Sequence, residues 1–377
     1  MRKMIPLSVP NLKGNELEYV THAIQTEWVS TAGPYITDFE KKMAAYVGAP
    51  EAVACQNGTA GLHLALMVAG VTSEDEVIVP TLTFIATVNP VKYIGAEPIF
   101  MDCDGSLTMD PMKLEQFCRN ECLLENNRLR NKRTGKRIKA VVVVHVFGNM
   151  ADMIRIKDIA HRYHLTLIED ATEALGTYYT EGEYKGKYAG TLGDIGVYSF
   201  NGNKILTTGG GGIIVSDHKE YLEQCRYLST QAKDDTLYFV HDAIGYNYRM
   251  TNLQAALGLA QLEQLETFIE TKKQNYLEYQ KLGVALFPFR TGIRPNYWFY
   301  SYMTGERDNL LHHLEQQQIQ SRPIWKLIHT QKPYQQAQAY QIERANYYYE
   351  HIINLPCSSN LTKDDVETVV TAIKQLR

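Results

Sequence analysis

The stretch GVYSFNGNKILTTGGGGIIV, residues 196–215, decides the fold that we expect for this chain. Its two ends, Gly196–Phe200 and Gly212–Val215, have the length and branched side chains of buried strands. Between them lie a turn that ends in Lys204 and a run of glycines, Gly209–Gly212. A lysine in a tight turn beside a buried strand is held in place and partly desolvated, which favours the uncharged amine that forms an imine. The segment therefore predicts two strands of a sheet with a reactive amine at its edge.

Further apolar runs upstream predict more strands of the same sheet. They alternate with amphipathic stretches of helical period, as expected when helices cover both faces of a mainly parallel sheet. The strands are predicted at Ala52–Cys55, Glu76–Val79, Pro98–Asp102, Ala140–Val146 and Leu165–Glu169, and the helices at Thr59–Val68, Met153–Tyr163 and Lys219–Leu228. Residues from about 50 to 216 therefore predict an α/β domain.

After Thr251 the pattern changes to one long helical run, from Asn252 to about Leu282, with almost no helix breakers. Two later helices are predicted at Asn309–Gln318 and Lys363–Leu376. A chain of 377 residues exceeds the size at which one core usually stops growing. We therefore expect a large domain over residues 1–250, with an N-terminal arm over about residues 1–15. The long helix and a smaller α+β domain follow over residues 251–377.

Composition and charge narrow the class of protein. The formal net charge is -4 and no stretch approaches about 18 continuous apolar residues, so we expect neither a nucleic-acid partner nor a membrane span. The six cysteines form no paired framework, and the N-terminus has no apolar leader, which together favour a cytoplasmic protein. Cys118 and Cys122 alone do not predict a metal site.

Residues 126–137 carry six basic side chains without interleaved aromatics, and predict a solvated hairpin or loop rather than a polyanion site.

Ligands of open α/β sheets bind outside the carboxyl ends of the strands. Three more segments at such positions are candidates for a ligand site. Asn57-Gly58-Thr59-Ala60 opens a helix and suits a phosphate, although Asn-Gly is also a common turn. In Glu169-Asp170-Ala171-Thr172-Glu173, the carboxylate of Asp170 either keeps a pyridine nitrogen protonated or caps the following turn. Gly245–Asn252 precedes the long helix, and an ordinary helix start is the alternative there.

In their order and spacing these segments resemble the DegT/StrS sugar aminotransferases, which use pyridoxal 5'-phosphate. The match runs from Pro6 to the terminal helix. It rests on Asn57–Thr59, Thr83–Ala86, Glu169–Ala171, Ser199-Phe200 with Lys204, Thr207–Gly209 and Gly245–Arg249. Within the family, Asn201–Lys204 and Ser321–His329 resemble the branch that aminates C4 of nucleotide-linked 2-acetamido-4-keto-6-deoxyhexoses. That branch serves bacillosamine and legionaminic acid pathways, and the basic insertion resembles the legionaminic branch more closely.

The resemblance implies a type I aminotransferase fold, a homodimer with shared active sites, and glutamate and a nucleotide-linked keto-sugar as substrates. Pyridoxamine 5'-phosphate would be the intermediate form of the cofactor. By position, Lys204 would bind the cofactor covalently, Asp170 would pair with its ring nitrogen and Phe84 would stack on the ring. Gly58, Thr59 and Ser199 would hold the phosphate together with Asn247 of the partner subunit, and Glu173, a glutamine in many relatives, would lie near the cofactor hydroxyl.

Substrate contacts are expected from Trp28, Ser30, Arg322, Trp325 and His329, and packing within a domain core is an equal alternative for Trp325. His145 is either adjacent to the cofactor or a structural histidine.

Rival functions are disfavoured by single features of the sequence. A sugar dehydratase of related fold would have histidine in place of Lys204. A regulatory protein that merely kept the fold would not need Asp170, Ser199, Lys204 and Asn247 together. The glycine run lacks the spacing and terminal Lys-Ser/Thr of a nucleotide-triphosphate loop. Amination of a 3-keto nucleotide sugar stays open as an alternative reaction.

Overall fold

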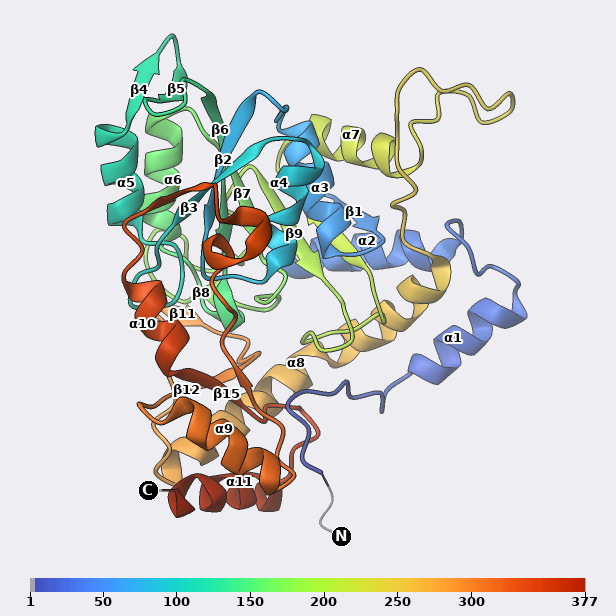
Figure 1. The fold of residues 1–377 in the computed structure, drawn as a ribbon. Helices are drawn as coiled ribbons and strands as arrows, with labels where there is room; N and C mark the ends of the chain where they lie inside the picture. Colours follow the sequence, from blue (N-terminus) through green and yellow to red (C-terminus); the bar gives the residue numbers. More distant parts are fainter. Residues whose placement is uncertain (1–3, 377) are drawn as a thin grey trace.

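A long twisted sheet forms the centre of the larger part of the molecule (Figure 1). The computed structural model describes residues 4–376. The main path of the sheet runs β1-β10-β9-β7-β6-β2-β3-β14. These strands are β1 (Ala52–Cys55), β2 (Asp75–Pro80), β3 (Glu97–Met101), β6 (Arg137–Val144), β7 (Thr166–Asp170), β9 (Ile195–Ser199), β10 (Gly212–Val215) and β14 (Gln338–Tyr340). β1, β10 and β9 pair antiparallel, and every pair from β9 to β14 is parallel. The predicted mainly parallel α/β sheet is confirmed.

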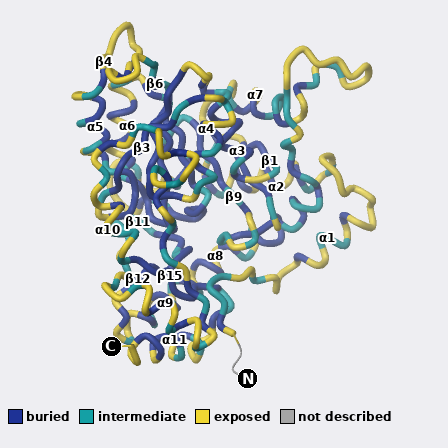
Figure 2. The backbone as a smooth tube through the Cα atoms, viewed as in Figure 1, coloured by how far each residue is buried: buried dark blue, intermediate teal, exposed yellow. Residues whose placement is uncertain are grey.

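Helices cover both faces of this sheet. Successive strand residues point to opposite faces, so Val141 and Val143 of β6 pack in one core while Ala140 and Val142 pack in another. The first core includes α2 (Pro34–Val47), α5 (Pro111–Asn120) and α6 (Met153–Arg162), and the second includes α3 (Gly58–Val68), α4 (Asn89–Tyr93) and α7 (Lys219–Ser229). Figure 2 shows the central strands as almost continuously buried. Such two-sided burial explains why these strands read as unbroken apolar runs in the sequence.

Helix α8 (Asn252–Lys281) connects the sheet and its covering helices to a smaller unit at the bottom of Figure 1. It begins with a capping box in which the Thr251 hydroxyl accepts the Gln254 N–H and the Gln254 side chain accepts the Thr251 N–H. The smaller unit has an antiparallel sheet of β12 (Tyr300–Met303), β15 (Ile352–Leu355) and β13 (Arg322–Pro323). α9 (Arg307–Gln316) and α11 (Lys363–Gln375) contribute to its separate core, which includes Tyr276 and Tyr279 of α8.

The remaining elements are α1 (Glu16–Gln25), α10 (Arg344–His351), β8 (Tyr178–Tyr179), β11 (Ile293–Arg294) and the 3-10 turns η1 (Ile85–Thr87), η2 (Val146–Gly148), η3 (Ile328–Thr330) and η4 (Lys332–Tyr334). The basic insertion, residues 126–137, supplies the turn and the second strand of a hairpin between β4 (Cys122–Glu125) and β5 (Arg128–Asn131), and a hairpin was one of the two predicted alternatives. β5 also pairs with β6.

Two features bear on the predicted domain division. β14, which follows residue 250, pairs in parallel with β3 and so extends the sheet of the larger unit. The boundary at residue 250 stays a prediction. In the N-terminal arm, the described part pairs Ile5 with Ile319, and the Ser358 hydroxyl accepts the Val9 N–H. Residues 1–3 of the predicted arm lie outside the described residues.

All six cysteines lie in the described chain, buried and without disulfides. Within residues 4–376, His, Cys, Asp and Glu side chains form no group that could hold a metal ion. Over the same residues, none of the helices has the length and apolarity required to cross a bilayer.

Candidate active site

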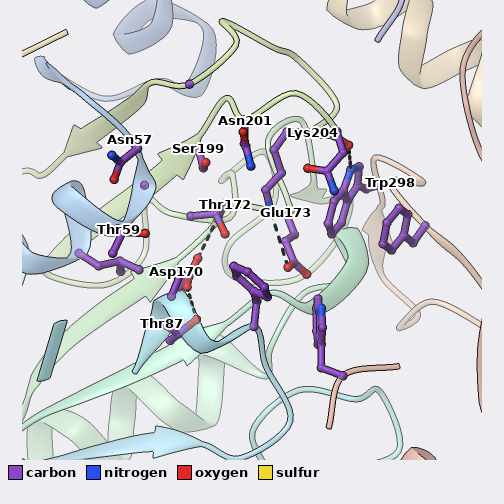
Figure 3. Close-up of a pocket in the computed structure, with 18 of the residues that line it drawn as sticks. Asn57, Thr59, Thr87, Asp170, Thr172, Glu173, Ser199, Asn201, Lys204 and Trp298 are labelled. Atoms are coloured by element: carbon purple, nitrogen blue, oxygen red, sulfur yellow. Dashed lines mark hydrogen bonds and ion pairs between the residues drawn. The ribbon is translucent and has the colours of Figure 1, made fainter. Parts of the chain in front are cut away.

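A cavity of about 500 Å³ opens beside the carboxyl ends of β7 and β9 (Figure 3). The strands end there in Asp170 and Ser199, and the N-terminus of α3 borders the same space. Eight residues predicted for the site line this cavity: Gly58, Thr59, Phe84, Asp170, Glu173, Ser199, Lys204 and Trp325. The structure thus brings these eight residues together at one cavity beside the carboxyl edge of the parallel strands.

The amine of Lys204 points into the cavity (Figure 3). Its Nζ lies 3.7 Å from Glu173 Oε1 and 4.2 Å from the ring centroid of Trp298, and the side chain is only 12% exposed. The turn that carries Lys204 is held in place by a neighbouring segment, because the Asn203 carbonyl oxygen accepts the indole N–H of Trp298 at 2.8 Å. The structure therefore holds the amine at a defined position between a carboxylate and an aromatic face.

Asp170 presents a buried carboxylate to the same space. Its Oδ2 accepts the Thr87 hydroxyl at 2.6 Å, and its Oδ1 accepts the Thr172 N–H at 3.1 Å. The second bond is the turn cap considered from the sequence. Each oxygen has a further lone pair, so capping does not prevent the carboxylate from accepting a ring N–H. The two interpretations of Asp170 are compatible.

The start of α3 forms part of the cavity lining. Asn57 caps the helix by accepting the Ala60 N–H at 2.8 Å, and Gly58 and Thr59 form the first turn. Ser199 packs directly on Gly58: a Cβ at that glycine would lie 2.8 Å from Ser199 Cβ. A helix N-terminus with an adjacent hydroxyl favours a phosphate dianion, because its backbone N–H groups and its dipole both face the ligand.

We expect Gly58→Ala to weaken cofactor binding about tenfold or more, because the added methyl would force Ser199 and Thr172 away from the start of α3. The measurement is a titration of cofactor-free protein with pyridoxal phosphate. Gly305→Ala is the matched control, since a Cβ there meets nothing within 4 Å. Equal affinity of the two variants would exclude a phosphate site at this helix start.

Glu173 is a buried carboxyl group that faces Lys204. Its Oε2 accepts the Phe147 N–H at 2.8 Å. Burial raises the pKa of the Glu173 carboxyl to about 7, although Lys204 and the Phe147 N–H act in the opposite direction, and Asp170 adds to the rise. Glu173 therefore changes protonation near neutral pH, where a carboxyl group in water is fully ionised.

An aromatic wall completes the cavity. The sequence assigned Trp325 of this wall to the site, but not Trp298 or Phe299. Trp298 stacks on Phe299 at 4.1 Å between ring centroids, and Trp325 packs on Phe147 at 4.6 Å. Trp298 and Phe299 belong to the aromatic run Tyr297–Tyr302 of the smaller unit. Its position beside Lys204 depends on how that unit packs against the carboxyl edge of the sheet, which no local pattern encodes.

His145 has the structural role that was one of its two alternatives. The Ala151 N–H donates to Nδ1 at 3.1 Å, so the other nitrogen, Nε2, carries the proton and donates to Glu169 at 2.8 Å. Burial raises the pKa of Glu169, but His145 and the N–H groups of Gly193 and Gly190 outweigh this and leave it below its usual value. This buried pair supports the strand ends beneath the cavity.

The other predicted site residues do not line the cavity of their own chain. The carbonyl oxygens of Trp28 and Ser30 accept hydrogen bonds from Asn252. Arg322 lines a separate cavity of about 300 Å³, and His329 Nδ1 lies 2.6 Å from the Thr81 hydroxyl, where burial lowers the pKa of the ring. Asn247 is exposed. A substrate or cofactor role for these five residues stays a prediction.

The cavity fits pyridoxal phosphate on three separate grounds: an amine for its aldehyde, a carboxylate for its ring nitrogen and a helix start for its phosphate. The exposed ring of Phe84 at the cavity edge adds a face for stacking. The fold and the site together define a pyridoxal phosphate-dependent aminotransferase.

The chain belongs to the DegT/DnrJ/EryC1/StrS aminotransferase family, which it matches over residues 10–374. It is a sugar aminotransferase. It is 36% identical to a GDP-perosamine synthase of Caulobacter vibrioides and 39% identical to one of Escherichia coli O157:H7, in each case over 99% of this chain and 98% of the relative. The solved structure of a family member from Brucella abortus has a TM-score of 0.88 at 28% identity, covering 96% of this chain and 95% of that one. These names support the family and activity, whereas the legionaminic acid or bacillosamine branch stays a proposal.

Proposed function

We propose that the enzyme transfers an amino group from glutamate to C4 of a nucleotide-linked 2-acetamido-4-keto-2,6-dideoxyhexose, supplying an amino-sugar for surface glycan or nonulosonic acid synthesis. The observation that carries the proposal is the convergence of Lys204, Asp170 and Ser199 on one cavity with an aromatic wall. Aromatic faces suit the apolar faces of sugar rings. A volume of about 500 Å³ leaves room for a sugar beside the cofactor.

The chain's residues have separate tasks in this reaction. Bound pyridoxal phosphate supplies an electron-accepting ring. Lys204 Nζ would take the proton from the α-carbon of glutamate and pass it to the cofactor's aldehyde carbon, and in the second half-reaction it would move a proton from that carbon to C4 of the sugar. Asp170 keeps the positive charge on the ring nitrogen, while Gly58, Thr59 and Ser199 hold the phosphate end. Because both half-reactions use one cavity in turn, the kinetics are expected to be ping-pong.

The deciding experiment gives the purified enzyme glutamate with UDP-linked and GDP-linked 4-keto-6-deoxy-N-acetylhexosamine and follows formation of 2-oxoglutarate and of the amino-sugar. The GDP arm is included because the names of two relatives specify a GDP-sugar. Amine found at C4 supports the proposal, and turnover only of a 3-keto nucleotide sugar replaces it with the alternative. If addition of glutamate left the absorbance of the bound cofactor unchanged, the result would favour the alternative of a regulatory protein that kept the fold.

The position of Asn247 supports a shared active site. Asn247 is exposed and does not line the cavity of its own chain. The loop that precedes it projects from the body of the molecule in Figure 1 and exposes Leu237, Tyr238, Phe239 and Ile244. Exposed apolar groups gathered on one loop are typical of an interface. We therefore include in the proposal a homodimer in which Asn247 of the partner subunit contacts the cofactor phosphate.

Mixing two inactive variants tests that arrangement. A heterodimer of Lys204→Ala and Asn247→Ala subunits contains one site with both native residues, so random exchange should recover about a quarter of wild-type activity. The measurement is activity after co-refolding of differently tagged subunits, with each variant refolded alone as the control. Heterodimers that isolate on both tags and show no gain over the parents would count against shared sites.

A further inference from the structure

Glu173 and Lys204 form a pair of opposite charge in the cavity wall. The dashed line in Figure 3 joins Lys204 Nζ to Glu173 Oε1 at 3.7 Å, and the Glu173 side chain is 2% exposed. The second carboxylate oxygen, Oε2, is held by the Phe147 N–H from η2 at 2.8 Å. The carboxylate is therefore fixed by the backbone on one side and faces the amine on the other.

Few other charged groups face this pair. Asp170, at the end of β7, is the neighbouring carboxylate and opposes ionisation of Glu173. The Trp298 ring covers the amine from the smaller unit. Behind the lysine stem, Lys272 of α8 lines a small cavity that Lys204 also borders, and its Nζ donates to the Cys357 carbonyl oxygen. His145, from the β6 end, is directed to Glu169.

We propose that Glu173 is the proton partner of Lys204: Oε1 takes a proton from Nζ when the amine must become neutral, and returns it when the amine is again charged. The transfer breaks one N–H bond and forms one O–H bond, so an ammonium and a carboxylate become an amine and a carboxylic acid. The pair stays neutral in both states, which avoids a lone charge in a buried site.

Glutamine at this position could still accept the Phe147 N–H, but it could not take up the proton. This inference rests on Lys204 being the reactive amine of the proposed function. It adds a proton-holding residue to that site. Burial raises the pKa of Glu173 to about 7, which places its proton uptake within reach of neutral pH.

The test uses the full-length protein stripped of cofactor, so that the readout is independent of turnover. Acetic anhydride acetylates only neutral amines. The rate of Lys204 acetylation is followed by peptide mass spectrometry between about pH 5 and 10, spanning ordinary carboxyl and amine titration. In Glu173→Gln the ammonium loses its counter-charge, so the midpoint of the Lys204 profile should fall by about one pH unit or more.

Glu183→Gln removes a carboxylate from an exposed surface turn and is the matched control, for which the midpoint should not move. Glu173→Asp keeps a carboxyl group and should restore the midpoint towards the wild-type value. Glu173→Asp also shows whether a shift in Glu173→Gln comes from the lost charge, which aspartate keeps, or from a disturbed fold. A Glu173→Gln midpoint that is unchanged or higher would overturn the proposal.

The two proposals fail in different ways. An unchanged midpoint in an enzyme that aminates the keto-sugar would remove the proton partner alone. A shifted midpoint without any sugar amination would retain the pair and remove the proposed substrate.

Discussion

Lys204→Ala is expected to lower kcat by at least about 10⁴-fold, or about 5.4 kcal/mol of transition-state stabilisation. The reason is the position of its Nζ, inside the cavity and 3.7 Å from the Glu173 carboxylate. In the proposed reaction this amine both binds the cofactor and moves the proton in each half-reaction, so alanine removes two tasks at once. No other lysine lines the cavity among the residues that the structure describes.

The measurement is single-turnover and steady-state kinetics with glutamate and the keto-sugar, after confirming that the variant folds and binds pyridoxal phosphate. Because Lys204 lies at a cavity rather than in a packed core, loss of its side chain should leave the fold intact. Lys363→Ala, an exposed substitution at the start of α11, is the control and should retain wild-type rates. Comparable rates for the two variants would exclude Lys204 as the reactive amine.

Asp170→Asn is expected to have the second-largest effect, a loss of about 10²-fold or more in kcat, equivalent to about 2.7 kcal/mol. Asparagine is nearly isosteric and can still accept a hydrogen bond from the Thr87 hydroxyl or the Thr172 N–H. What it lacks is the negative charge that stabilises a positive ring nitrogen. The loss should therefore affect both half-reactions, while cofactor affinity changes less because the phosphate contacts remain.

The two half-reactions are measured separately, with glutamate alone and with the aminated enzyme and keto-sugar. Asp217→Asn is the surface control, since Asp217 is exposed and distant in sequence from the strand end at Asp170. A loss below about tenfold, or 1.4 kcal/mol, would indicate that another group holds the ring charge.

The sequence determined the elements and the places where chemistry could occur. Strands such as β7 and β9 are buried on both faces, so they appear as apolar runs whatever packs on them. Their ends then locate Asp170 and Lys204 at one edge of a parallel sheet without knowledge of the full fold. The capped start of α3 and the basic hairpin of β4 and β5 are likewise local, since turn and cap chemistry involve neighbouring residues.

Only the tertiary structure decided which distant side chains meet. Trp298 reaches Lys204 because the smaller unit packs against the carboxyl edge of the sheet, and Thr87 reaches Asp170 from a turn 83 residues away in the chain. The same packing keeps Arg322 and His329 out of the cavity lining, and it buries Glu173 deeply enough to raise its pKa to about 7. Periodicity and turn motifs encode contacts within a few residues, whereas burial, charge pairing and cavity shape arise from contacts between segments that the sequence does not place side by side.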